Sequence, residues 1–171
     1  SVETLGSTDI ICSDKTGTIT ENKMQVKSIY VNNKLYTEKD SIDNMNLYNY
    51  CLSSCQNVTK NNDKYLGDET EVAIYKYLEE KNILINIPRI KEYPFDSDRK
   101  MMSTINIIDN KEYSFTKGSL DSVLHNCTYY LEDNKLYNIT TEYKEKIFKI
   151  EEEESEKSLR ILEIAYKTKN T

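Results

Sequence analysis

The sequence CSDKTGTITE, at residues 12–21, decides how the rest of the chain is interpreted. Two isoleucines immediately before it predict a short strand over residues 9–13, and the polar residues that follow predict a turn. Open α/β sheets carry out their chemistry at the carboxyl ends of their strands, which is where this pattern puts Asp14. An aspartate there is available as a nucleophile that holds a phosphoryl group covalently.

The residues after Asp14 suit the handling of a phosphate group. Lys15 supplies positive charge, and Gly17 lets the backbone approach an anion closely. Thr16 and Thr18 offer hydroxyl and amide groups to phosphate oxygens. A structural alternative is an Asx-turn or a helix N-cap, which Ser-Asp and Thr-Gly stretches commonly form. Segments farther along the chain favour the phosphate interpretation.

The stretch resembles the phosphorylation motif of the P-type ion-pumping ATPases, in which Asp-Lys-Thr-Gly-Thr carries the phosphorylated aspartate. The resemblance implies that Asp14 accepts a phosphoryl group from ATP and that Lys15, Thr16 and Thr18 complete the catalytic segment. It also implies that Asp14 and Thr16 bind Mg²⁺ in the complete pump. ATP and Mg²⁺ are therefore the expected cofactors.

Composition excludes several other classes of protein. The 171 residues suit one domain, or one domain and a piece of another. With 29 acidic against 23 basic residues, the chain lacks the positive charge of a nucleic-acid-binding surface. No apolar stretch approaches the roughly 20 residues that cross a bilayer, and no signal peptide is present, so we expect a soluble chain. The single histidine rules out a His-rich metal site, and the four cysteines, which form no Cys-x-x-Cys pair, are expected in the core.

The spacing of apolar residues predicts an α+β domain with an antiparallel β-sheet flanked by helices. Helices are predicted at 44–54, 68–81, 120–125 and 140–157. Strands are predicted at 24–31, 89–93, 101–108, 112–117 and 159–166, with hairpin turns at 32–33 and 109–111. Because Asp14 calls for a parallel sheet, residues 1–23 are predicted to be a stub of the phosphorylation domain and a hinge. Residues 24–171 are then the nucleotide-binding domain, truncated at its C-terminal end.

Four further segments resemble the nucleotide-binding domain of the same family. Residues 66–73, LGDETEVA, resemble a helix start whose acidic residue meets the adenine amino group, which implies that role for Asp68. Residues 94–103, PFDSDRKMMS, resemble the segment Phe-Ser-x-x-Arg-Lys-x-Met-Ser. Its aromatic ring stacks on adenine and its lysine lines the pocket, which implies these roles for Phe95 and Lys100.

The other two segments supply cations. Residues 116–119, TKGS, resemble the Val-Lys-Gly-Ala element at the floor of the ATP pocket, which places Lys117 and Gly118 there. Residues 159–162, LRIL, resemble a strand whose arginine reaches the phosphates, which implies that role for Arg160. A nucleotide needs an aromatic face for its base, an acceptor for its amino group and cations for its phosphates. No Walker-type P-loop is present.

Each of these residues also has an ordinary structural interpretation. Phe95 suits a strand edge, Lys117 suits a solvated turn, and Arg160 could form an ion pair with Glu156 or Glu163. Two positions depart from the family pattern. Residue 97 is a serine where animal calcium pumps often have an arginine, and residue 119 is a serine where alanine is expected.

The family's remaining parts are not among these 171 residues. They are the Gly-Asp-Gly-x-Asn-Asp motif, the distal lysine, the Thr-Gly-Glu loop and the membrane helices. The resemblance therefore implies a monomeric segment on the cytoplasmic side of a membrane that binds ATP without turnover. Its partners are the phosphorylation, actuator and transmembrane domains of the same pump, and no nucleic acid. The residues of the motif are most similar to those of calcium-type pumps, which favours calcium as the transported ion.

Two alternatives remain open at this point. A haloacid-dehalogenase-type phosphatase shares the nucleophilic aspartate, but usually has a second aspartate two residues later, where Thr16 stands. Threonine suits holding the acyl-phosphate better than hydrolysing it. The second alternative is a non-catalytic module that binds adenine nucleotides.

Overall fold

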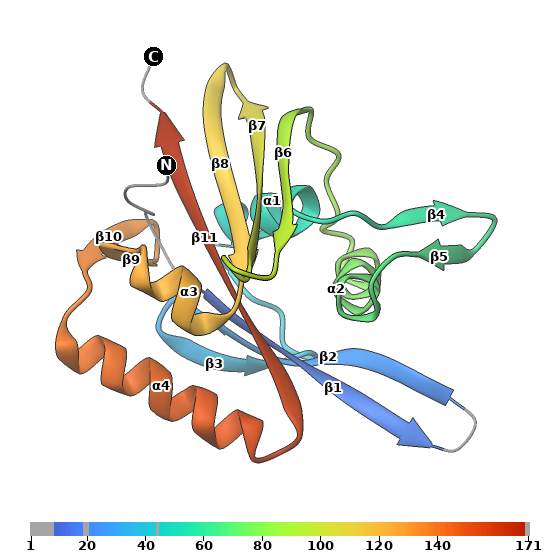
Figure 1. Ribbon diagram of the computed structural model, residues 1–171, viewed down its shortest axis with the longest axis horizontal. Helices are drawn as coiled ribbons and strands as arrows, with labels where there is room; N and C mark the ends of the chain where they lie inside the picture. Colours follow the sequence, from blue (N-terminus) through green and yellow to red (C-terminus); the bar gives the residue numbers. More distant parts are fainter. Residues whose placement is uncertain (1–8, 19–20, 44, 170–171) are drawn as a thin grey trace.

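A seven-stranded antiparallel sheet forms the centre of the protein (Figure 1). The computed structural model describes the backbone of residues 9–18, 21–43 and 45–169, and the side chains of residues 24–43 and 45–168. The strands run in the order β3-β2-β1-β11-β8-β7-β6. Their bounds are β1 Asp9–Thr18, β2 Glu21–Val31, β3 Lys34–Thr37, β6 Arg89–Asp96, β7 Met101–Ile108, β8 Lys111–Gly118 and β11 Leu159–Lys169.

Helices cover both faces of this sheet. Helices α1 (Asn46–Ser54) and α2 (Glu69–Glu80) pack on one face, over a core that includes Phe115 and Met102. Helices α3 (Leu120–His125) and α4 (Thr141–Ser155) pack on the other face, where Met101 lies in a separate small cluster. Adjacent methionines on β7 thus point to opposite faces, as the alternation of side chains along a strand requires. The four predicted helices and the α+β class are confirmed.

Two small hairpins, which the sequence did not predict, extend from the sheet. One consists of β4 (Thr59–Asn61) and β5 (Lys64–Leu66), and the other of β9 (Tyr129–Glu132) and β10 (Lys135–Asn138). Their strands are three or four residues long, and all but β9 are mostly exposed. Such strands have no alternation of apolar and polar residues long enough to be recognised. No helix in the described ranges has both the length and the apolar composition needed to cross a membrane.

Asparagine and aspartate pairs close four of the hairpins. Both residues of each pair have a positive φ, between 48° and 66°. This backbone conformation defines the two-residue turns whose twist matches that of paired strands, and Asn and Asp tolerate it better than other non-glycine residues. The pairs are Asn32-Asn33, Asn62-Asp63, Asp109-Asn110 and Asp133-Asn134.

Side-chain caps fix the starts of three helices. The Asp68 carboxylate caps α2, and the Thr140 hydroxyl, which accepts a hydrogen bond from the Tyr143 amide at 3.1 Å, caps α4. Ser119, which departs from the family's alanine, caps α3 by accepting from the Ser122 amide at 3.3 Å. The serine therefore has a structural role that alanine does not provide.

Strand β1 differs from the expectation for the N-terminal segment. It continues through Thr18 and lies between β2 and β11, antiparallel to both. Asp14 is opposite Gln25 on one side and Leu159 on the other, so it lies within a strand of the antiparallel sheet. Only residues 19 and 20 separate β1 from β2, which makes β2 the nearest pairing partner along the chain. The division between domains at residue 23 stays a prediction.

Candidate functional site

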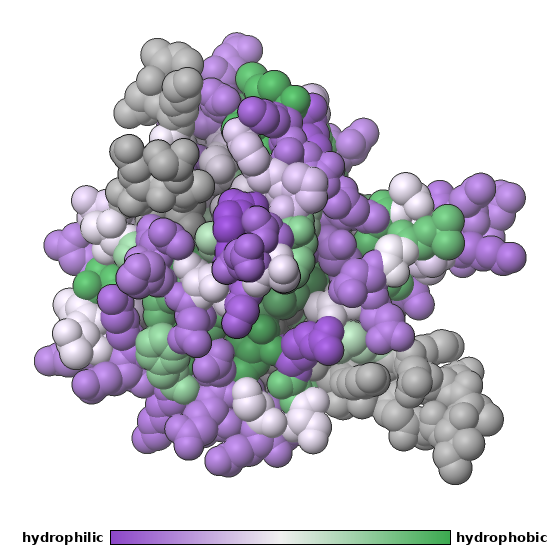
Figure 2. All heavy atoms as spheres, viewed as in Figure 1, coloured by the Kyte–Doolittle hydropathy of each residue, from purple (hydrophilic) through white to green (hydrophobic). Residues whose placement is uncertain are grey.

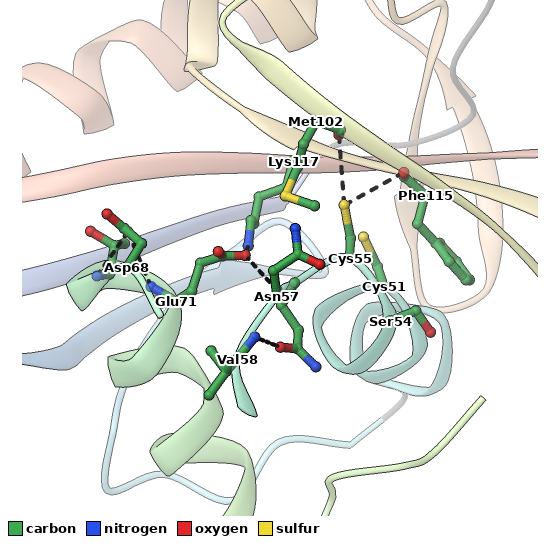
Figure 3. Close-up of polar contacts among 12 residues, drawn as sticks. Cys51, Ser54, Cys55, Asn57, Val58, Asp68, Glu71, Met102, Phe115 and Lys117 are labelled. Atoms are coloured by element: carbon green, nitrogen blue, oxygen red, sulfur yellow. Dashed lines mark hydrogen bonds and ion pairs between the residues drawn. The ribbon is translucent and has the colours of Figure 1, made fainter. Parts of the chain in front are cut away.

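A buried ion pair joins β8 to the first turn of α2. Lys117 is opposite Met102 on β7 and Ile164 on β11, both of which belong to the core beneath α1 and α2. The lysine side chain therefore points to that face, where its Nζ lies 2.7 Å from Oε2 of Glu71 (Figure 3). Lys117 is 5% exposed. An ammonium this deeply buried requires a charged partner, because desolvation without one is costly.

The loop after α1 holds the carboxylate of Glu71 in place. The backbone amide of Asn57 donates to Glu71 Oε2 at 3.2 Å, and the side-chain amide of Asn57 donates to Glu92 Oε1 at 2.6 Å. Arg89 donates to Oδ1 of Asn57 at 3.0 Å and to the carbonyl oxygen of Ser54 at the end of α1. This polar network connects α1, α2 and the edge strand β6.

A second cation approaches α2 from β11. Nη1 of Arg160 donates to Oγ1 of Thr70 at 3.2 Å, rather than forming an ion pair with Glu156 or Glu163. Thr70 is 3% exposed, and its hydroxyl also lies 3.4 Å from the sulfur of Met24 on β2. Thr70 and Glu71 are adjacent, so the first turn of α2 meets both Arg160 and Lys117.

The structure gives Asp68 a capping role. Its carboxylate accepts from the backbone amides of Thr70 and Glu71, at 3.1 and 3.4 Å. Such a cap stabilises the helix that carries the two polar residues of the site. The expected contact of Asp68 with adenine stays a prediction. Sequence reasoning missed Thr70 and Glu71 as site residues, although the same motif, Gly-Asp-x-Thr-Glu, contains both.

The remaining predicted residues gather at one end of β6, β7 and β8. Asp96 is opposite Met101, which in turn is opposite Gly118. Phe95, next to Asp96, is 63% exposed, and Lys100, in the turn between β6 and β7, is exposed as well. Among the described residues, the Phe95 ring has no aromatic or cationic neighbour, and its exposure leaves ring surface available for stacking.

Gly118 is required by the close approach of two strands. A Cβ atom at this position would lie 2.3 Å from the carbonyl oxygen of Lys100 and 2.8 Å from the Cα of Met101. The amide of Ser119 donates to the same Lys100 carbonyl at 3.1 Å, which holds this carbonyl against Gly118. Gly118 thus fixes the turn that carries Lys100 against the strand that carries Lys117.

Cys55, at the end of α1, lies near the ion pair. The Cys55 thiol contacts the carbonyl oxygens of Met102 and Phe115, each at 3.6 Å. Burial raises the pKa of Cys55 to about 11, against the opposing effect of the nearby Lys117 charge. The thiol is therefore a protonated core group, as expected. Among the residues that the structure describes, no cluster of His, Cys, Asp and Glu could hold a metal ion.

The side chains of Asp14, Lys15, Thr16 and Thr18 lie outside the described residues, so their catalytic and Mg²⁺-binding roles stay predictions. Their backbone belongs to β1, whose residue 13 is opposite Arg160 on β11. The backbone of the predicted phosphorylation motif therefore runs beside the strand that supplies one of the cations.

The arrangement provides the chemical groups that a nucleotide needs. Phe95 offers an aromatic surface, Glu71 and Asp68 are acceptors, and Lys100, Lys117 and Arg160 are cations. The structure brings Lys117 and Arg160 together at α2, and Phe95, Lys100 and Gly118 together at the end of the neighbouring strands. Thr70 and Glu71 link the two cations.

Known proteins resemble this chain closely. The family model described as "P-type ATPase, cytoplasmic domain N" matches residues 39–171. "Calcium-transporting ATPase 1" of Bacillus cereus is 40% identical over 182 residues, covering 99% of this chain and 20% of that protein. "Calcium-transporting ATPase 1" of Lactococcus lactis is 38% identical over 174 residues, covering 97% of this chain and 20% of that protein.

A third relative, the "Probable cation-transporting P-type ATPase" of Mycoplasma pneumoniae, is 38% identical over 128 residues, covering 74% of this chain and 14% of that protein. The chain thus spans about a fifth or less of the length of these relatives. The residues of the chain that match the family model include helices α1 to α4 and every residue of the candidate site from Asp68 to Arg160. The chain therefore belongs to the P-type ATPase family, as a protein that contains the cytoplasmic N domain.

Proposed function

We propose that this chain is the ATP-binding segment of a larger P-type ATPase that transports cations, with calcium as the ion. The observation that carries the proposal is the meeting of Lys117 and Arg160 with the first turn of α2. Two cations held at one helix start, near an exposed aromatic ring, suit a nucleotide better than they suit a structural role alone. The N-domain match and the names of the relatives support the same function.

Each residue has a distinct part in the proposed complex. Phe95 stacks on adenine, and the carboxylates of Asp68 and Glu71 are the acceptors available to its amino group. Lys100, Lys117 and Arg160 neutralise the phosphates. For Lys117, this requires its ammonium to bind phosphate oxygens while it keeps one hydrogen bond to Glu71, and an ammonium has three donors for this purpose.

In the complete pump, the γ-phosphoryl group of the bound ATP is transferred to Asp14. A carboxylate oxygen of Asp14 attacks the γ-phosphorus in line, the bond from that phosphorus to the bridging oxygen breaks, and ADP leaves. Mg²⁺, which ATP carries, neutralises charge on the phosphates. The chain's own contribution is to bind and orient the nucleotide.

Titration of the 171-residue chain with Mg·ATP tests the proposal. Stacking of a base on an aromatic side chain contributes about 1–3 kcal/mol, so Phe95→Ala is expected to weaken binding about tenfold or more. Phe148→Ala is the matched control, because Phe148 is also an exposed phenylalanine but lies on α4, on the other face of the sheet. Equal affinities of the Phe95→Ala variant and the unmodified chain would contradict the assignment.

Calcium transport requires a separate measurement on the complete protein. Membrane vesicles that contain the full-length pump are expected to accumulate radioactive calcium when Mg·ATP is added, and Asp14→Asn is expected to abolish the uptake. Uptake of another cation in place of calcium would contradict the choice of ion and leave the ATP-binding proposal intact.

A further inference from the structure

A cavity of about 600 Å³ opens between α3, α4 and the turn that leads into β7. In Figure 2, green apolar surface lies among purple hydrophilic side chains around α3 and α4, which face the viewer. The volume of the cavity falls within the range typical of small-molecule pockets, about 300–1,000 Å³. The lining residues are Arg99, Met101, Asp121, Ser122, Leu124, His125, Asn126, Lys144 and Phe148.

This cavity lies on the face of the sheet opposite the Lys117–Glu71 ion pair, while its residue Arg99 adjoins Lys100 of the candidate nucleotide site. The side chains of Met101 and Leu124 at its base belong to the clusters beneath α3 and α4. Lys117, by contrast, points to the face beneath α1 and α2, where it meets Glu71. The sheet therefore lies between the cavity and the ion pair. Arg99 belongs to the segment that resembles a nucleotide-binding motif, yet it lines this cavity.

The cavity carries an excess of positive charge in a chain whose net charge is −6. Arg99 and Lys144 are cations, Asp121 is the single acidic residue of the lining, and His125 is the only histidine of the chain. Among the described residues, the Arg99 guanidinium donates to two backbone carbonyls, those of Met101 at 3.2 Å and Pro94 at 3.5 Å. Within the described ranges, neither Arg99 nor Lys144 forms an ion pair.

The base and one wall of the cavity are apolar. Met101 and Leu124 at the base are only 7% and 1% exposed, so the apolar surface open to a ligand comes mainly from Phe148. Phe148 is one helical turn after Lys144 on α4, and its ring is 36% exposed. Residues four apart lie on the same face of a helix, so the ring and the ammonium are presented together. A ligand that fills this space needs an apolar body and a negatively charged group.

We propose that this cavity is a binding site for a small organic anion with an aromatic or aliphatic body. The apolar body packs mainly on the Phe148 ring, above Met101, while the anionic group meets Arg99 and Lys144. An inorganic anion alone leaves the Phe148 ring uncovered, and a neutral apolar compound leaves the two cations without a negatively charged partner. Arg99 and Lys144 determine the preference for negative charge.

The aromatic sulfonate 8-anilinonaphthalene-1-sulfonate is a suitable probe, because its fluorescence increases in an apolar site. Its binding is measured with saturating Mg·ATP present, so that the candidate nucleotide site is occupied. We expect one site per chain, and a dissociation constant raised at least fivefold by either Arg99→Gln or Lys144→Gln. N-phenyl-1-naphthylamine, which has the same aromatic body without the sulfonate, is expected to bind at least fivefold more weakly.

Lys149→Gln is the matched control, since Lys149 is an exposed lysine of α4 that does not line the cavity. It is expected to leave the affinity for the sulfonate unchanged. Lys144 is exposed and forms no ion pair with any described residue, so its replacement tests the site without threatening the fold. Equal affinities of all variants, equal binding of the neutral probe, or the absence of a saturable site would each overturn the proposal. The affinity for ATP is measured in parallel and is expected to stay the same in Lys144→Gln.

Discussion

Oε2 of Glu71 lies 2.7 Å from Nζ of Lys117 and 3.2 Å from the backbone amide of Asn57. The side chains of the two ionic partners are only 14% and 6% exposed. When one member of such a pair is removed, the other remains as a buried charge without a partner. The ammonium of Lys117 is therefore held at a defined place before any ligand arrives, and pre-organisation of this kind favours binding.

Replacing Lys117 by methionine is expected to weaken ATP binding about tenfold or more, which corresponds to roughly 1.4 kcal/mol. Methionine keeps much of the apolar stem but removes the ammonium that would meet the phosphates. Isothermal titration calorimetry measures the effect. Lys64→Met, in the exposed β5 strand, removes the same charge and is expected to leave the affinity unchanged. Equal losses in both variants would show a general effect of net charge.

Replacing Gly118 by alanine is expected to destabilise the protein by about 1–3 kcal/mol, because the new methyl group would collide with the Lys100 carbonyl. For a chain of this size, that corresponds to a decrease in Tm of roughly 2–12 °C. Thermal unfolding followed by circular dichroism measures the decrease. An unchanged Tm would show that β7 and β8 separate at no cost, contrary to the close approach described above.

Alkaline pH is expected to destabilise the protein through the buried thiol of Cys55. Burial raises its pKa in the folded state from 9.0 to about 11. A group whose pKa is raised on folding contributes its full stability below the unfolded pKa and loses it as the pH rises through the folded pKa. The free energy of unfolding is therefore expected to fall between pH 9 and pH 11, by at most about 3 kcal/mol from this thiol.

Urea denaturation at a series of pH values measures this loss. The variant Cys55→Ala has no thiol at this position and is expected to lose less stability over the same pH interval. A smaller loss persists in the variant, because burial also raises the pKa of Tyr77 to about 12 and that of Cys127 above its usual value. If the two proteins lost the same stability, the thiolate of Cys55 would have no part in the alkaline transition.

Asp14 is not expected to accept a phosphoryl group from ATP in the 171-residue chain. Correct positioning of the reacting groups supplies much of the rate enhancement in phosphoryl transfer. The 171 residues do not contain the family's Gly-Asp-Gly-x-Asn-Asp motif or its distal lysine. Incubation with γ-labelled ATP and Mg²⁺, followed by acid precipitation, is expected to give no labelled protein. Label that is sensitive to hydroxylamine and absent in Asp14→Asn would show that the reaction needs fewer groups than we infer.

Most strands of the sheet could be predicted from the sequence, because strands and hairpin turns are marked by residues close together in the chain. The pairs Asn32-Asn33 and Asp109-Asn110 marked two hairpins, since few other residues adopt a positive φ. The acidic residues Asp68 and Glu69 marked the start of α2 because negative charge is favoured at a helix N-terminus, and in the structure Asp68 caps that helix. The small β4–β5 and β9–β10 hairpins escaped prediction, because strands of three or four residues are too short to show a periodic apolar pattern.

The relation between Glu71 and Lys117 could not be read from the sequence alone. These residues are 46 positions apart, and their contact depends on α2 packing over the β8 register. The cavity beside Arg99 likewise depends on how α3 and α4 are packed together. Resemblance to known motifs indicated which short segments belong to the site, but tertiary packing decides which side chains within them meet.

The position of β1 has a consequence for how quickly this protein reaches its native state. Asp9 pairs with Ile164 and Asp14 with Leu159, so the centre of the sheet is closed by contacts between residues about 150 positions apart. Chains dominated by such distant pairings fold slowly, because the entropy of closing a long loop is lost before the contacts are gained. The local β6–β7–β8 meander has no such barrier. Refolding is therefore expected to build this meander early and to add β1 beside β11 in the slowest step.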